Sequence, residues 1–405
     1  MSVIEAVTMA AGLAYLVLLA WQARSGWQWR LALGLLLMLW LLAADSLLWL
    51  GVGLVAGALA LWHQRRPRPA LEALDSQWLR GRTRQLLLLC WGLVAVQYVV
   101  HIWQLGQGMT PWLMRPDVVD GFLPIAGGLG LRAWLTQGLI DPHHPAATVT
   151  VLVLCLSALL LGRAFCAWFC PLGLVGEWLY GLRSRLLPGE WTPPRWLDVV
   201  LRGQKFLVLA FLLFIVLIAV PGAALPGYFT SPYHQAADMK MGAFFFNLTL
   251  ISGLCLGWVL LLTATFRQGF CRYLCPYGAW LALLGLFTPL RIRRDPARCL
   301  RSAGHDCDKC SRACPSRIQV HQLIAVRSLE CTSCLSCVAA CPRRADALHL
   351  GSQGRRLAPR QLLGLLCLLL LVLPLLAYGL LDLWVSQTPL AERYDLLQRL
   401  PWLNH

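Results

Sequence analysis

Six apolar runs, each about as long as a bilayer is thick, constrain the fold of this 405-residue chain more than any other feature. A membrane-spanning helix needs about 20 predominantly apolar residues. The runs occupy residues 3–21, 84–105, 146–164, 204–221, 245–266 and 361–383. Hydrophobic residues make up 58% of the chain and charged residues only 13%, which excludes an ordinary soluble domain. We therefore expect an all-α polytopic membrane protein.

The arginine positions predict how these helices are oriented. Segment 30–62 is too long for one span, but two short helices that turn near Asp45 fit it. With that turn, all the arginine-rich connections fall on one side, at residues 24–30, 65–84, 163–205 and 267–360. The positive-inside rule makes this side cytoplasmic, so we expect about eight helices in a bacterial inner membrane. The net charge of +16 then reflects orientation rather than a nucleic-acid partner, and we expect no cleavable signal.

Residues 291–360 interrupt the apolar pattern and predict a small α+β domain inserted before the last helix. They carry 14 Lys and Arg residues against 5 Asp and Glu, and eight cysteines lie between Cys299 and Cys341. In the topology above, this domain is cytoplasmic. We expect four regions in order: three N-terminal helices with a basic loop, a membrane core, the cysteine-rich domain, and a last helix with a short tail. Their bounds are 1–83, 84–290, 291–360 and 361–405.

The second half of the cysteine-rich domain has the ligand spacing of bacterial 4Fe-4S ferredoxins. It reads Cys331-x2-Cys334-x2-Cys337-x3-Cys341-Pro342. In this type of run, the three closely spaced cysteines hold one cluster and the fourth reaches across to a second cluster. The spacing therefore predicts two cross-ligated clusters.

The first half departs from that pattern. It reads Cys299-x7-Cys307-x2-Cys310-x3-Cys314-Pro315, and Gly304 stands where the first cysteine of the run is expected. A longer loop must then bring in Cys299. Cross-ligation assigns Cys299, Cys307, Cys310 and Cys341 to cluster one, and Cys314, Cys331, Cys334 and Cys337 to cluster two. The alternative is a pair of zinc sites, which rarely use a run of this kind.

A nine-residue motif occurs twice at the ends of apolar runs. Phe165–Gly173 reads FCAWFCPLG, and Phe270–Gly278 reads FCRYLCPYG. We expect both to reach the cytoplasmic edge of the membrane, each with a helix end before its proline. Their cysteines could hold a third metal or iron–sulfur centre, act as two redox dithiols, or pack as reduced thiols; they are Cys166, Cys170, Cys271 and Cys275. The other cysteines within apolar runs read as small buried hydrophobes.

With these motifs, the chain resembles the membrane polyferredoxins grouped with NosR, NapH and CcoG. The resemblance rests on the two CxxxCP motifs followed by two ferredoxin cysteine runs, and it covers about residues 84–383. GGLGLRAW at 127–134 and HPAA at 144–147 also look like the stretch before the first motif in NosR-type proteins. The large flavin domain of the NosR branch and the terminal immunoglobulin-like domain of the CcoG branch are not expected here. Covalent flavin is therefore not implied.

The expected function is electron transfer between the quinone pool, or a cytoplasmic donor, and a respiratory or periplasmic acceptor. No nucleotide motif or acid–base pair is visible, so an electron carrier is favoured over a self-contained enzyme. The resemblance also allows an assembly factor that reduces or handles copper for an oxidase, and a structural membrane anchor is a third interpretation. His101, His143 and His144 are expected at similar depth, where a quinol-site role or ordinary interfacial histidines are favoured over haem.

Overall fold

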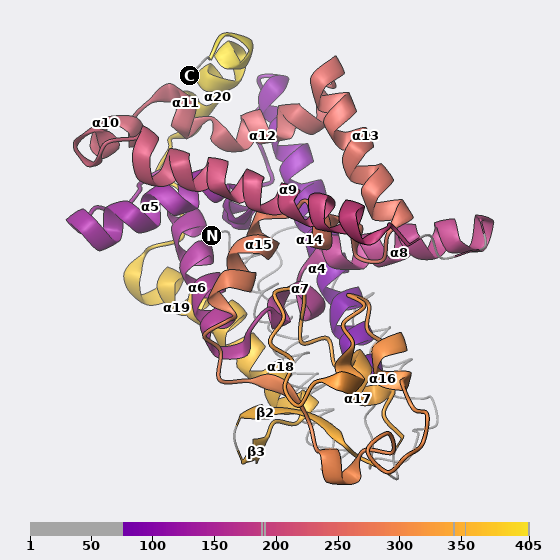
Figure 1. Cartoon of the computed structure of the whole chain (residues 1–405). Helices are drawn as coiled ribbons and strands as arrows, with labels where there is room; N and C mark the ends of the chain where they lie inside the picture. Colours follow the sequence, from indigo (N-terminus) through magenta and orange to yellow (C-terminus); the bar gives the residue numbers. More distant parts are fainter. Residues whose placement is uncertain (1–75, 188, 190–191, 343–344, 353, 404–405) are drawn as a thin grey trace, which may run out of the picture.

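The computed structural model describes residues 76–403, except 188, 190–191, 343–344 and 353, as a mainly helical molecule (Figure 1). The predicted spans at 3–21 and 30–62 lie outside the described residues. A small antiparallel sheet with its loops occupies one end of the molecule, and short helices gather at the other end. We call these the inner and the outer end.

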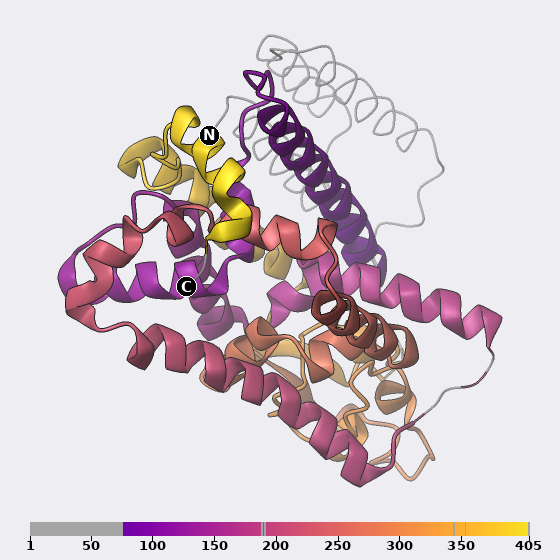
Figure 2. The same ribbon diagram turned by 90° about the horizontal axis from the view of Figure 1, so that it is seen from above.

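Three described helices are long and apolar enough to cross a membrane. They are α4 (Ser76–Gly106), α9 (Arg195–Phe214) with its π-helical continuation η2 (Ile215–Ala219), and α18 (Pro359–Cys367), which runs through η6 (Leu368–Val372) into α19 (Leu373–Leu381). In Figure 2, α4 and α9 flank the shorter helices from opposite sides. The predicted spans 84–105, 204–221 and 361–383 coincide with these helices. The total of eight stays a prediction.

The two remaining predicted spans are shorter than expected for local reasons. The run 146–164 forms α6 (Pro145–Leu161), which ends at Gly162 because this residue adopts a positive φ of 63°. The run 245–266 is split between α12 (Ala237–Phe246) and α13 (Leu250–Thr265), which meet at 77°. Thr249 and Ser252 form a reciprocal capping box that starts α13. This bent pair could serve as a fourth span.

Prolines and glycines shape the helical core. The helices α5 (Pro124–Gln137), α6, α8 (Pro171–Leu186), α15 (Pro276–Leu284) and α18 all begin with proline near the first position, where its missing N–H costs nothing. Gly127 lets α5 approach α6, since a Cβ at that position would lie 2.7 Å from the Ala147 carbonyl oxygen. This close packing of α5 on α6 explains why the GGLGLRAW stretch has a glycine at position 127.

The sheet at the inner end joins the two ends of the cysteine-rich segment. Strand β2 (Leu348–Ser352) lies between β1 (Arg291–Arg294) and β3 (Arg355–Arg356), and all the pairings are antiparallel. In the register of the first pair, Arg291 lies opposite Gly351 and Arg294 opposite Leu348. Because the strands close the segment at its base, both cysteine runs project from it as loops that carry α16 (Lys309–Arg312) and α17 (Ser336–Ala339).

The outer end consists of short elements from distant parts of the sequence. Figure 1 shows α10, α11 and α20 together there. The elements are η1 (Asp117–Phe122), η3 (Gly222–Ala224), α10 (Leu225–Phe229), α11 (Pro232–Gln235), α20 (Leu390–Arg399) and η7 (Leu400–Trp402). Four further short helices lie nearer the inner end: α7 (Ala164–Trp168), α14 (Gly269–Tyr273), η4 (Pro296–Arg298) and η5 (Val320–Gln322).

Candidate iron–sulfur sites

Two cavities at the inner end each bring four cysteines together. The first is lined by Cys299, Cys307, Cys310 and Cys341. The second is lined by Cys314, Cys331, Cys334 and Cys337. These are the two sets that cross-ligation predicts, with the cysteine before each proline reaching over to the other run.

Left-handed backbone lets both cysteine loops curl around their cavities. Gly304 has a φ of +89°, and the turn around it folds the inserted loop back so that Cys299 reaches the first cavity. A cysteine at position 304 would be strained in this conformation. In the second loop, Ser333 and Leu335 have φ values of 50° and 60°, which is unusual for non-glycine residues. These strained backbone conformations allow the loop to place three thiols around one cavity.

The chemistry of both cavities fits a 4Fe-4S cluster. Each offers four thiol donors, and the remaining walls are mainly apolar, with Leu300 and Leu348 in the first cavity and Ile318 and Val326 in the second. Such surroundings and an all-cysteine donor set are typical of these clusters. Within the part of the chain that the structure describes, no three histidine, cysteine, aspartate or glutamate side chains form a site for a single metal ion.

The repeated motif brings its four cysteines to one larger cavity of about 220 Å³. We call Cys166, Cys170, Cys271 and Cys275 the cysteine quartet. Each motif is a short helix, an extended cysteine and a new helix that begins at proline, as the sequence predicts. The closing glycine of each motif lies against the first cysteine, since a Cβ at Gly173 would be 2.9 Å from the Cys166 carbonyl oxygen. The Gly278 N–H donates to the Cys275 sulfur at 3.2 Å.

Buried side chains join the quartet to the loops of the second cavity. Arg163, which is 3% exposed, donates to the Leu329 carbonyl and interacts electrostatically with Cys166 and Cys271. The buried Trp168 ring N–H donates to the Ser333 carbonyl at 3.2 Å.

Two more cations reach the same loops. Arg272, inside the second motif, donates to the Ser316 carbonyl at 3.3 Å. Lys205 of α9 is fully buried and pairs with Glu330 at 2.7 Å. The quartet and the second cavity therefore belong to one packed unit.

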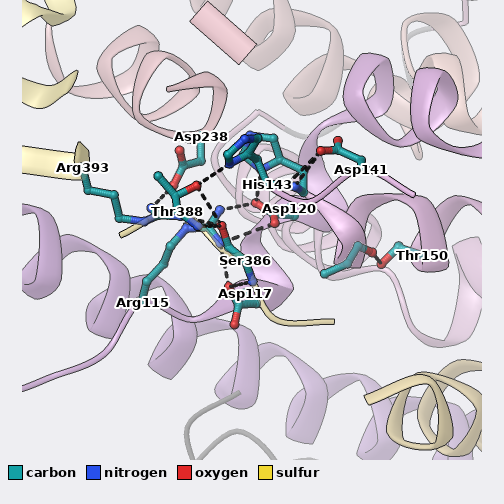
Figure 3. Close-up of polar contacts among 12 residues, drawn as sticks. Arg115, Asp117, Asp120, Asp141, His143, Thr150, Asp238, Ser386, Thr388 and Arg393 are labelled. Carbon is teal, nitrogen blue, oxygen red and sulfur yellow. Dashed lines mark hydrogen bonds and ion pairs between the residues drawn. The ribbon is translucent and has the colours of Figure 1, made fainter. Parts of the chain in front are cut away.

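At the outer end, a buried network of charged residues was not predicted from the sequence (Figure 3). Arg115 contacts Asp117 at 2.8 Å, Asp238 at 2.8 Å and Asp120. Arg393 reaches Asp238 at 3.4 Å. We call the following residues the outer network: Arg115, Asp117, Asp120, Asp141, His143, His144, His234, Asp238, Ser386, Thr388 and Arg393.

The histidines singled out from the sequence meet at this end. The Nδ1 of His144 lies 3.1 Å from Asp120, and His143 contacts Thr388 at 2.8 Å. Burial alone would lower the pKa of His144, but the Asp120 carboxylate outweighs it and the pKa is raised. Burial lowers the pKa of His143. His101 of α4 contacts the Leu113 carbonyl at 2.8 Å, beside the network.

Comparison with protein families gives both cysteine regions a cofactor class. Residues 144–189 and 248–294, which contain the two CxxxCP motifs, match a 4Fe-4S binding domain. Residues 291–342 match a 4Fe-4S dicluster domain. These matches therefore favour iron–sulfur clusters over zinc as the cofactor of the cysteine runs.

Similar proteins identify the family. The putative electron transport protein YccM of Escherichia coli is 38% identical over 291 residues, which cover 69% of this chain and 78% of that protein. The chain belongs to the NosR/NapH-like polyferredoxin family. The ferredoxin-type protein NapH of Haemophilus influenzae is 25% identical, with 63% of this polyferredoxin and 87% of NapH covered. The regulatory protein NosR of Pseudomonas aeruginosa is 30% identical, but the match covers only 24% of its length. No solved structure is significantly similar to this polyferredoxin.

Proposed function

We propose that the protein is an electron carrier of the bacterial inner membrane that exchanges electrons between the quinone pool and a respiratory or periplasmic acceptor. Its membrane-embedded helices and its family support this role, and relatives named for electron transport point in the same direction. The arginine distribution supports a cytoplasmic position for residues 291–360. The protein is then one component of a redox chain rather than an enzyme with its own substrate chemistry.

The two cysteine-lined cavities support ligand sets for two clusters. Cys299, Cys307, Cys310 and Cys341 would hold cluster one, and Cys314, Cys331, Cys334 and Cys337 would hold cluster two. When bound, the clusters supply one-electron carriers. The chain itself contributes the thiols, the mainly apolar walls and the strained loop turns that keep the thiols converging.

The contact between the cysteine quartet and the second cavity is the observation that carries the proposal. Arg163 touches both, and Trp168 binds the backbone beside Cys334. A quartet that served only as a packing turn would need no such link to a cluster loop. We therefore propose that the quartet holds a third iron–sulfur centre, which connects the membrane interior with the ferredoxin-type module.

Iron analysis of two variants tests the third centre. With three 4Fe-4S clusters, the purified protein should hold about 12 iron atoms per chain, and the double variant Cys166→Ser/Cys271→Ser should hold about 8. The control Cys255→Ser changes an exposed cysteine of α13 and should keep the wild-type content. An unchanged iron content in the double variant, with an unchanged electron paramagnetic resonance spectrum, would exclude the third centre.

Reduction kinetics test the electron-transfer role. In vesicles that contain the wild-type protein, added quinol or quinone should change the redox state of the clusters within seconds, as followed by visible absorbance. The double variant should react much more slowly, whereas Cys255→Ser should match the wild type. Clusters that respond to neither quinol nor quinone would favour the structural-anchor interpretation instead.

A further inference from the structure

A small cavity lies where the cysteine-rich domain meets the helical core, and we call it the junction cavity. It is lined by Gly162 after α6, by Gly285 after α15, and by residues of β1 and of the loop before Cys331. The sheet that contains β1 adjoins the start of a candidate membrane span, because α18 follows β3 after two residues (Figure 1). The junction cavity is therefore expected at the depth of the lipid headgroups.

Backbone pairing places two arginines side by side at this cavity. The Val326 N–H donates to the Ile292 carbonyl of β1 at 2.9 Å, in an antiparallel register. The same register puts Arg327 opposite Arg291, and both residues line the cavity. Like charges placed directly opposite each other on a sheet are destabilising. This arrangement suits a site that is occupied by an anion.

The protein supplies no anion of its own to these arginines. Among the residues that the structure describes, no carboxylate lies within ion-pair distance of Arg291, Arg293 or Arg327. The Arg291 side chain donates to the Leu286 carbonyl at 2.6 Å, which leaves its charge uncompensated. Burial and the neighbouring Arg327 and Arg293 lower the pKa of Arg291, so all three cations repel one another.

The cavity also offers hydrogen-bond donors to oxygen atoms. Ser328 and Ser333 line it together with the two arginines. The Ser328 hydroxyl accepts from the Glu330 N–H at 3.2 Å, and its own proton is left to donate. The cavity volume of about 30 Å³ holds one or two oxygen-sized groups. A phosphate can therefore insert its oxygens while the rest of its molecule stays outside.

Exposed apolar side chains beside the arginines indicate where that molecule lies. Leu286 lines the cavity and is 42% exposed, and the adjacent Phe287 is 78% exposed. Ile324, on the segment that pairs with β1, is 65% exposed. Cations next to exposed aromatic and aliphatic side chains suit the boundary between lipid headgroups and acyl chains. An acidic soluble protein would leave this apolar surface uncovered.

We propose that the junction cavity binds the phosphate of an anionic membrane phospholipid. The phosphate oxygens accept hydrogen bonds from Arg291 and Arg327, and the acyl chains lie outside along Leu286 and Phe287. A zwitterionic lipid has the same phosphate, but its headgroup cation would be repelled by the arginines. Cys331 lines the cavity as well, so the bound lipid fastens the loop of the second cysteine-lined cavity to the bilayer. This role is independent of the electron-transfer function proposed above.

Native mass spectrometry of the full-length, cluster-loaded protein tests the proposal. After incubation in micelles with equal amounts of phosphatidylglycerol and phosphatidylcholine, the wild type should retain one phosphatidylglycerol with roughly tenfold preference. Arg291→Gln/Arg327→Gln should abolish most of this preference. The matched control Arg301→Gln/Arg312→Gln removes the same charge from arginines that already pair with aspartates, and it should keep the preference. Iron content should be equal in all three proteins.

Arg327→Glu covers the case in which the double variant loses its clusters, because position 327 is exposed. It should lose the preference, whereas the control Arg301→Glu should keep it. Equal losses in the junction variants and their controls would overturn the site and leave only a general attraction to basic residues. Full displacement of phosphatidylglycerol by excess inorganic phosphate would overturn it in favour of a free-anion site. A wild type without preference for phosphatidylglycerol would also overturn it, and an acidic protein would become the better partner.

Discussion

Buried charged side chains have different partners at the two ends of the molecule. At the inner end, the buried cations have mixed partners. Arg163 donates to the Leu329 carbonyl of a cluster loop, whereas Arg272 binds both the Ser316 carbonyl and the Asp198 carboxylate. Lys205 pairs with Glu330. At the outer end, charged side chains bind one another, with Arg115 in contact with three aspartates. A carbonyl oxygen accepts the hydrogen bond of an arginine but leaves its charge uncompensated. A carboxylate accepts the hydrogen bond and also neutralises the charge.

This difference in partners indicates a different role for each end. Because Arg163 binds a carbonyl, it leaves positive charge beside cavities that suit clusters with thiolate ligands, and such charge favours the added electron. The outer network sets four aspartates against two arginines and His144, whose pKa is raised. Much of its charge is therefore compensated internally, and it can hold distant loops together. Electrostatic tuning is thus expected from the inner end, and structural integrity from the outer end.

The largest effect is expected for Arg115→Leu. This change leaves Asp117, Asp120 and Asp238 buried without their main cation. Loss of one partner from a buried ion pair costs roughly 3–5 kcal/mol. The free energy of unfolding in mixed micelles should fall by about that amount, while cluster potentials measured in the remaining folded protein should not move.

Arg399→Leu is the control for that prediction. Arg399 forms an exposed ion pair with Asp395 at 2.9 Å in α20. Surface pairs of this kind contribute at most about 0.5 kcal/mol, so the free energy of unfolding should stay nearly unchanged. Equal losses in Arg115→Leu and Arg399→Leu would remove the structural role assigned to the outer network.

Arg163→Gln should have an intermediate effect, and on the midpoint potential rather than on the free energy of unfolding. The guanidinium interacts electrostatically with Cys166, Cys271 and Cys331. Its loss removes a buried positive charge that favours the reduced centre, so the midpoint potential should become more negative. An interaction of about 1–2 kcal/mol corresponds to a shift of about 40–90 mV for one electron. Redox titration followed by electron paramagnetic resonance measures the shift.

Arg185→Gln is the matched control for the potential. Arg185 is exposed near the end of α8, 15 residues beyond Cys170, which is about 22 Å along the helix. Solvent screens charges at such distances, so the potential should stay within the measurement error. A more positive potential in Arg163→Gln would contradict the electrostatic role of Arg163.

The inner end was predictable because its residues form local motifs. Ferredoxin spacing alone grouped the eight cysteines into the two sets that line the two cavities. The irregular Cys299 also lines the first cavity, because the positive φ of Gly304 turns the inserted loop back. The proline of each CxxxCP motif likewise predicted the helix break that the structure contains. The assignment of these cysteines as ligands remains a prediction for the iron analysis.

The outer network was not predictable because its residues are far apart in the sequence and share no motif. Arg115 and Arg393 are separated by 278 residues and meet on Asp238. The available signal was indirect: His143 and His144 were expected at a similar depth to His101. It could not identify Asp120 or Thr388 as their partners, because pairing across loops depends on the tertiary fold.

The smallest effect, a pH dependence, also separates the two ends. The raised pKa of His144 means that its pairing with Asp120 stabilises the fold fully below the ordinary histidine pKa, about 6.5, and less as pH rises through the higher folded value. Asp141, Asp238, Arg115, His143 and His234 also face this pair. His143, whose pKa is lowered, works in the opposite direction, so the wild-type curve alone is ambiguous.

The difference between the wild type and His144→Gln isolates the contribution of His144. Glutamine keeps a hydrogen-bond donor near Asp120 but cannot take up a proton. The advantage of the wild type in unfolding temperature should be largest near pH 6 and should shrink toward pH 9. Cluster potentials should be the same in both proteins at each pH, because His144 lies at the end away from the cysteines. An advantage that grows with pH would show that His144 is buried neutral, and the outer network would then hold one positive charge fewer.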